Sequence, residues 1–161
     1  MTPILSNRSR KVDVATVELR FSALPAHVRT ARLVAAAVAR RSGVDEAVLD
    51  EVRLAVGEAC SRAVHLHRRH CPDVPVMVTL NDDEKAFSVA VTDEAPQGLR
   101  EDQGSLADLA ASADATTDLD QDVLMPEVGL AVISGLVEDV AVEPRRNGGV
   151  VVTMTWSTIP A

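Results

Sequence analysis

The stretch LDEVRLAVGEACSRAVHLHRRH, from Leu49 to His70, decides the fold of this 161-residue chain. Its apolar residues recur at intervals of three and four, which is the period of one buried face of an α-helix. Acidic residues lie in its first turn and basic residues in its last, as the helix dipole favours. The stretch therefore predicts one long helix, whose buried face is formed by Leu49, Val52, Val56, Ala59, Cys60, Ala63 and Val64.

Two charged residues, Glu58 and Arg62, lie among these apolar positions. A carboxylate four residues before a guanidinium is its neighbour on the helix surface, and an exposed pair of this kind contributes about 0.2–0.5 kcal/mol. The spacing therefore predicts an ion pair between Glu58 and Arg62, either as a solvated pair or as part of a site.

The composition predicts a globular protein with an aliphatic core. Apolar residues make up 47% of the chain but aromatic residues only 2%, so Val, Leu and Ala must fill the core. This length suffices for one domain with a sizeable core. No apolar segment approaches the roughly 20 residues needed to span a membrane, and the N-terminus lacks the hydrophobic core of a signal peptide. We therefore expect a cytoplasmic protein, not bound to a membrane, in which Cys60 and Cys71 are reduced.

The net charge of −8 is unevenly distributed along the chain. Between Asp93 and Glu127 there are ten acidic residues and one arginine, which give −9 and leave +1 for the rest of the chain. A nearly neutral body with an acidic segment argues against nucleic acid as the main partner. The acidic segment suits either a basic protein partner or a solvated loop.

The remaining elements follow from alternation, helical periodicity and turn residues. Residues 1–11 are polar and predict a disordered tail, while residues 12–157 predict a single domain. Pro25 is expected to break the chain before a helix that ends at Gly43, and Asp45 is expected to cap the long helix. The expected strands are 12–21, 76–80, 86–92, 139–143 and 150–156. The other expected helices are 27–41 and 128–137, and the second of these is expected to be buried all round. The inward residues of the first are expected to be Val28, Ala31, Leu33, Val34, Ala35 and Val38.

This order of elements predicts the fold class. Four of the strands form two hairpins, and hairpins give antiparallel sheets. Helices on one face of a mostly antiparallel sheet make an α/β two-layer sandwich. The acidic segment at about 94–126 then becomes a long lid-like insert. Residues 94–121 are expected to be mobile because they are acidic and poor in large apolar side chains.

Four local sequences resemble motifs of the GHKL superfamily of histidine-kinase-like ATPases, which includes DNA gyrase and the histidine kinases. Within that superfamily, the likeness is greatest to bacterial anti-sigma factors that are also serine/threonine kinases. The resemblance extends from residue 12 to residue 156 and implies a Bergerat-type fold that binds ATP and magnesium. The motifs are LAVGEACSRAV at 54–64, VTD at 91–93, VGLAVI at 128–133 and GGVVV at 148–152.

The resemblance also implies roles for individual residues. Glu58 would be the catalytic carboxylate if the protein is an active enzyme, and Asp93 would read the adenine of ATP. Gly129 and Leu130 would begin the helix beneath the phosphates, and Gly149 would belong to the final hairpin of the nucleotide site.

Several positions depart from the family pattern. Arg62 stands where the family has a magnesium-binding asparagine, and a guanidinium offers only donors, so it cannot be a ligand. Ala95 and Gln97 replace loop glycines at positions where the backbone must approach a ligand. Glu127 replaces the first glycine of the next motif and would repel a phosphate. We therefore expect ATP binding to be weak or absent, and we expect neither magnesium nor another metal.

Three functional interpretations follow. The first is an active serine/threonine kinase that phosphorylates an anti-anti-sigma factor. The second is a pseudo-kinase in which Glu58 and Arg62 pair and fill the vacated metal site. In the third, Arg62 contacts a ligand phosphate directly. We favour the second, an anti-sigma-factor-like regulator of a partner-switching circuit. Its implied partners are a sigma factor, an anti-anti-sigma protein, or a second copy of the chain in a homodimer.

Four metal-binding residue types gather at the end of the long helix, namely His65, His67, His70 and Cys71. No second ligand cluster accompanies them in the sequence, and the neighbouring arginines crowd the region with positive charge. We therefore do not expect a metal site there.

Overall fold

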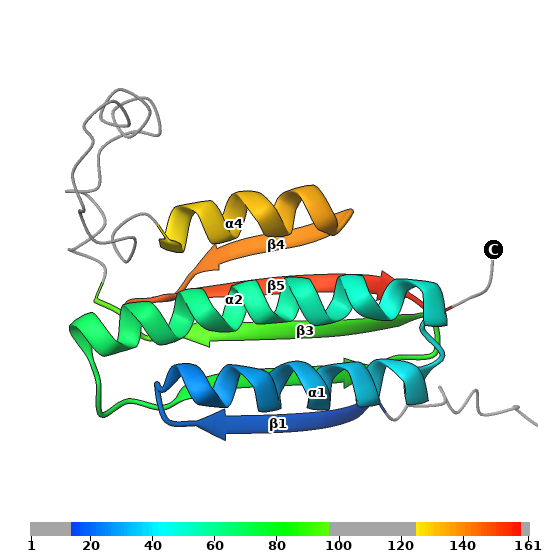
Figure 1. Ribbon diagram of the computed structural model, residues 1–161, viewed down its shortest axis with the longest axis horizontal. Coiled ribbons are helices and arrows are strands. Elements are labelled where there is room, and N and C mark those ends of the chain that lie inside the picture. Colours follow the sequence, from blue (N-terminus) through cyan, green and yellow to red (C-terminus); the bar gives the residue numbers. More distant parts are fainter. Residues whose placement is uncertain (1–13, 97–124, 159–161) are drawn as a thin grey trace, which may run out of the picture.

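In the part of the chain that the structure describes, five strands form one antiparallel sheet, and helices cover one of its two faces (Figure 1). The computed structural model describes residues 14–96 and 125–158, and for residues 125–129 the backbone alone. The elements are β1 (Ala15–Phe21), α1 (Pro25–Ser42), the 3-10 turn η1 (Glu46–Val48), α2 (Leu49–His70), β2 (Val76–Asp82), β3 (Ala86–Asp93), α4 (Met125–Leu136), β4 (Asp139–Pro144) and β5 (Val150–Ser157). The strand order is β1-β2-β3-β5-β4. The predicted α/β two-layer sandwich is confirmed.

Helix α2 lies at the centre of the helical layer, between α1 and α4 and against β3 (Figure 1). It begins at Leu49 and ends at His70, as the periodicity predicts. All seven residues of its predicted buried face are buried, and Val52, Val56 and Cys60 are completely so. Because full burial of one aliphatic side chain contributes about 1.5–3 kcal/mol, α2 is a major attachment of the helical layer to the sheet.

Helix α1 differs from its prediction at its start and on its outer face. Pro25 begins the helix instead of breaking the chain before it, because proline at the first helical position loses no intrahelical bond. Leu33 was expected inside but is 57% exposed, since alanines make the close contact with the core. The predicted end is confirmed: Gly43 adopts φ 92° and donates its N–H to the last carbonyls of the helix. The buried residues of α1 are Val28, Ala31, Ala35, Ala36 and Ala39.

The residue predicted to cap α2, Asp45, caps the short 3-10 turn before it. The Asp45 carboxylate accepts a hydrogen bond from the Ala47 N–H at 2.9 Å, which caps η1 and not α2. Helix α2 follows directly after η1, and its own N-cap residue, Val48, makes no side-chain cap. The 3-10 turn therefore takes the capping residue that the sequence assigned to the long helix.

Helix α4 is present as predicted, but only one of its faces is buried. Ile133 is fully buried, and Val137, just after the helix, is also buried, whereas Val132 is 37% exposed. The reason is its place at the edge of the helical layer, where α2 lies on one side and none of the described elements lies on the other (Figure 1). The prediction of a helix buried all round is therefore wrong.

The two hairpins, β2–β3 and β4–β5, are those expected from the sequence. The inner face of the sheet carries valines together with Phe87 and Trp156, whose rings stack with centroids 6.0 Å apart. The Trp156 indole N–H donates to Glu51 in the first turn of α2 at 2.9 Å. This bond satisfies the one polar atom of a large buried ring and ties the last strand to the central helix.

Candidate functional site

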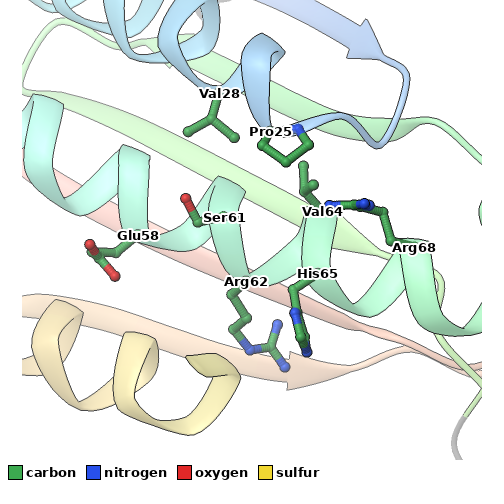
Figure 2. A pocket seen from close by; sticks show the side chains of 8 residues that line it. All are labelled: Pro25, Val28, Glu58, Ser61, Arg62, Val64, His65 and Arg68. Atoms are coloured by element: carbon green, nitrogen blue, oxygen red, sulfur yellow. The ribbon is translucent and has the colours of Figure 1, made fainter. Parts of the chain in front are cut away.

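A buried ion pair joins α2 to the end of β3. The Nη1 of Arg62 donates to Oδ2 of Asp93 at 2.9 Å, and the two side chains are 7% and 0% exposed. The predicted pair between Glu58 and Arg62 does not form, and Figure 2 shows the two side chains pointing in different directions. Arg62 lies on the inward side of α2, so it reaches a buried carboxylate 31 residues away in the chain in place of its neighbour on the helix.

Two further contacts fix Asp93, one to its carboxylate and one to its backbone. Its Oδ1 accepts the N–H of Ala95 at 3.2 Å, so both carboxylate oxygens are bonded. Gly149, with φ +84°, packs against its backbone so closely that a Cβ there would lie 1.9 Å from the Asp93 carbonyl oxygen. No L-residue with a side chain fits that contact. Gly149, assigned to the nucleotide site by resemblance, therefore fixes the position of the aspartate.

The Nε–H of Arg62 has no hydrogen-bond partner among the described residues, although it is buried. An unsatisfied buried donor costs about 1–3 kcal/mol. The Arg62–Asp93 contact thus uses Nη1 of the guanidinium and leaves its Nε–H donor without a described partner.

His67 also belongs to this site, although from the sequence it was only one of four candidate metal ligands at a place where no metal was expected. It is fully buried. Its Nδ1 donates to the Val74 carbonyl oxygen at 2.8 Å, and its Nε2 accepts the Glu94 N–H at 2.8 Å. These partners fix a neutral imidazole with its proton on Nδ1. The sequence could have indicated that His67 is buried, because it continues the buried stripe of the helix that runs through Cys60 and Val64.

The segment that leaves β3 is therefore fixed at its start. Glu94 is bonded through its backbone to His67 and through its carboxylate to Arg145, at 3.2 Å. Ala95 is 2% exposed. The expected mobility of residues 94–121 is wrong for Glu94 and Ala95. Residues 97–121, and the tail 1–11, lie outside the described residues.

Among the described residues, no three His, Cys, Asp or Glu side chains gather as a metal cluster. Burial raises the pKa of the Cys60 thiol from 9.0 to about 12. The pKa of Cys71 is also raised, mainly by burial and further by the charges of Glu94 and Asp93. Both cysteines are free thiols. Because the thiolate is the reactive form, neither is an activated nucleophile near neutral pH.

A cavity of about 220 Å³ opens beside α2 and the start of α1 (Figure 2). Glu58, half-buried at its rim, makes no hydrogen bond or ion pair with any described residue. It is the kind of carboxylate that can accept a proton. The cavity is lined by Pro25, Val28, Glu58, Ser61, Arg62, Val64, His65 and Arg68.

The remaining predicted site residues lie on α4. Position 127 and Gly129 are in its first turns, where the structure describes the backbone alone. Leu130 is half-buried and packs on the hydrophobic core. Their roles at a nucleotide stay predictions.

Comparison with known protein families gives a match to the histidine kinase-like ATPase domain over residues 21–156. The match covers strands β2, β3 and β4, nearly all of β5, the described helices α1, α2 and α4, and the buried pair, but only the last residue of β1. The chain belongs to the histidine kinase-like ATPase family. Comparison with curated proteins gives no match. Family membership thus agrees with the fold. Within the described segments, no helix is long and apolar enough to cross a membrane.

Proposed function

We propose that this histidine kinase-like ATPase domain is an anti-sigma-factor-like regulator of a partner-switching circuit in the cytoplasm. It acts by binding a sigma factor, an anti-anti-sigma protein or both, with a degenerate nucleotide site. The observation that carries the proposal is the buried Arg62–Asp93 pair.

That pair occupies two positions that a nucleotide would need. By resemblance, Asp93 would accept a hydrogen bond from the adenine, but both of its oxygens are already bonded. By the same resemblance, position 62 would hold magnesium, which a guanidinium cannot coordinate. Breaking one side of a buried ion pair costs about 3–5 kcal/mol. That cost lowers ATP affinity by about two to four powers of ten.

The surface of α1 supports a role in protein binding. Its outward residues include Arg29 and Arg32, and α1 has no acidic residue. Leu33, which follows Arg32, is 57% exposed, and Leu24 at the N-cap of the helix is 50% exposed. Arginine is enriched in protein–protein interfaces, and the exposed leucines beside these arginines add apolar surface that a partner could bury.

One observation favours a second candidate, an active serine/threonine kinase. Glu58, the family's catalytic carboxylate, is unpaired among the described residues and lines the 220 Å³ cavity. If Arg62 alone blocked such an enzyme, Arg62→Asn would restore magnesium-dependent ATP binding. We expect that it does not, because Ala95 still replaces a loop glycine and is buried.

The proposal is tested with two assays on the purified full chain. Sigma factors and anti-anti-sigma proteins encoded by the same genome are mixed with it singly and analysed by size exclusion. We expect a stable complex with at least one, weakened by Arg32→Glu/Leu33→Asp on α1 and unchanged by Arg69→Glu on α2. Labelled ATP and magnesium are then added, and no phosphate transfer above background is expected. Failure to bind any of these proteins contradicts the regulatory role, and phosphate transfer that Glu58→Gln abolishes establishes the kinase.

A further inference from the structure

Helices α1 and α2 lie side by side and run in opposite directions, so the start of α1 is next to the second half of α2 (Figure 1). The 220 Å³ cavity lies at this place, and its wall toward α1 includes Pro25 and Val28 of α1 and Val64 and Arg68 of α2. Figure 2 shows the Arg68 side chain bending toward Val64 and Pro25. The side of the cavity next to α1 is therefore a groove with apolar walls and an arginine at one end.

A second arginine lies farther along the same helix pair, where Arg32 of α1 rests on Gly57 of α2. A Cβ on Gly57 would lie 2.9 Å from Cδ and 3.1 Å from Nε of Arg32. The stem of Arg32 thus occupies the space that a side chain at position 57 would fill, while the residue as a whole stays exposed. Gly57 therefore positions Arg32, about 16 Å from the level of Arg68 along α2 at the helical rise of about 1.5 Å per residue.

The arginines along this groove lack counter-charges. Arg29, Arg32 and Arg68 make no ion pair with any described residue. Helix α1 contains no acidic residue. Glu58 lines the same cavity, but Figure 2 shows it on the side of α2 away from α1. Cations of one sign gathered along a groove attract a ligand of the opposite charge.

We propose that this groove, between Arg32 and Arg68, binds an acidic segment of the protein partner. The inference rests on the regulatory function proposed above and names the chemistry of the partner. One carboxylate of the segment pairs with Arg32, another pairs with Arg68, and an apolar side chain between them packs on the exposed ring of Pro25. A span of about 16 Å corresponds to about five residues of extended chain or about three turns of helix. The net charge of −8 disfavours nucleic acid as the occupant.

Fluorescence anisotropy with the full chain and a labelled peptide of glutamate and leucine, long enough to span the groove, tests the charge requirement. The same peptide with glutamine in place of glutamate is the control. We expect the glutamate peptide to bind more tightly, and less so as the ionic strength rises. Arg68→Gln should weaken its binding about fivefold, as expected for the loss of an exposed ion pair. Arg69→Gln should have no effect, because Arg69 does not line the cavity.

Gly57→Ala separates binding from stability. Alanine is the better helix former, and the exposed end of Arg32 is free to move aside. The urea midpoint of this variant should therefore stay unchanged or rise. Its affinity for the glutamate peptide should nevertheless fall about fivefold, because the methyl group displaces Arg32 from its place over α2. A glycine needed only for packing would instead lower the stability and leave the affinity unchanged.

Equal binding of the glutamate and glutamine peptides would overturn the proposal. So would a Gly57→Ala variant with wild-type affinity, or displacement of the glutamate peptide by a single-stranded oligonucleotide. If the partner found by size exclusion still binds Arg68→Gln and Gly57→Ala with full affinity, the groove assignment is wrong and the regulatory role stands. If the glutamate peptide binds as predicted but none of the candidate proteins does, the groove assignment is supported and the regulatory role is contradicted.

Discussion

Replacing Arg62 by methionine should destabilise the protein strongly. Methionine keeps much of the apolar stem of arginine and removes the charge. The Asp93 carboxylate, whose side chain is 0% exposed, then loses its counter-charge and cannot reach water. Breaking one side of such a pair costs about 3–5 kcal/mol. Because a domain is stable by about 5–15 kcal/mol in total, this single change should remove a large share of the free energy of unfolding.

Urea unfolding followed by the fluorescence of Trp156, the chain's one tryptophan, measures this loss. Asp93→Asn keeps an acceptor for the Ala95 N–H while removing the charge. The double variant Arg62→Met/Asp93→Asn should therefore lose clearly less than the sum of the two single variants. Arg69→Met is the matched control, because Arg69 is exposed on the same helix and its removal should change stability by less than about 0.5 kcal/mol.

Two results would refute this reasoning. A loss below about 1 kcal/mol for Arg62→Met would mean that Asp93 is solvated or already neutral. Strictly additive losses in the double variant would mean that the two side chains do not interact in solution.

Three further predictions concern single residues. Gly149→Ala should lower the free energy of unfolding in urea by more than about 2 kcal/mol, because its Cβ meets the backbone of Asp93. Gly135→Ala on α4, where a Cβ meets nothing, should be neutral or stabilising. Equal effects of the two substitutions on stability would contradict the contact between Gly149 and Asp93. Glu58→Gln should change stability by less than about 0.5 kcal/mol, and a loss comparable to that of Arg62→Met would reinstate the pair predicted between them. The pKa of Cys60 is raised from 9.0 to about 12 in the folded protein, so the free energy of unfolding should be full below pH 9 and fall as the pH rises toward 12, by at most about 1.4 kcal/mol per pH unit. The chain has no tyrosine that would titrate in the same range. Cys60→Ala should therefore flatten this decline, and an unchanged slope would refute the assignment to Cys60.

The sequence predicted the elements whose signals are local. Helix α2 begins and ends as expected because its apolar period and its charged ends agree. The two hairpins followed from alternation and turn residues. Errors arose where a local signal has two structural outcomes. Pro25 can precede a helix or begin it, and an aliphatic helix such as α4 can lie in the middle of a layer or at its edge.

The candidate site was harder to predict because it depends on contacts between distant segments. The i,i+4 rule assigned Arg62 to Glu58, but burial on the inward side of α2 brought it to Asp93. Resemblance had named both Arg62 and Asp93 separately, and only the fold placed them together. His67 could have been recognised as buried from the helical period, but its bond to the Glu94 N–H required the end of β3 to be in place.

Calorimetric titration of the purified chain with ATP, with and without magnesium, tests the central claim most directly. By resemblance, Arg62 and Asp93 stand at the positions that hold the metal and the adenine, and they bind each other. The account therefore predicts no saturable heat up to millimolar ATP and no effect of magnesium. Micromolar ATP binding that depends on magnesium would contradict it, since such binding requires the pair to open and another group to hold the metal.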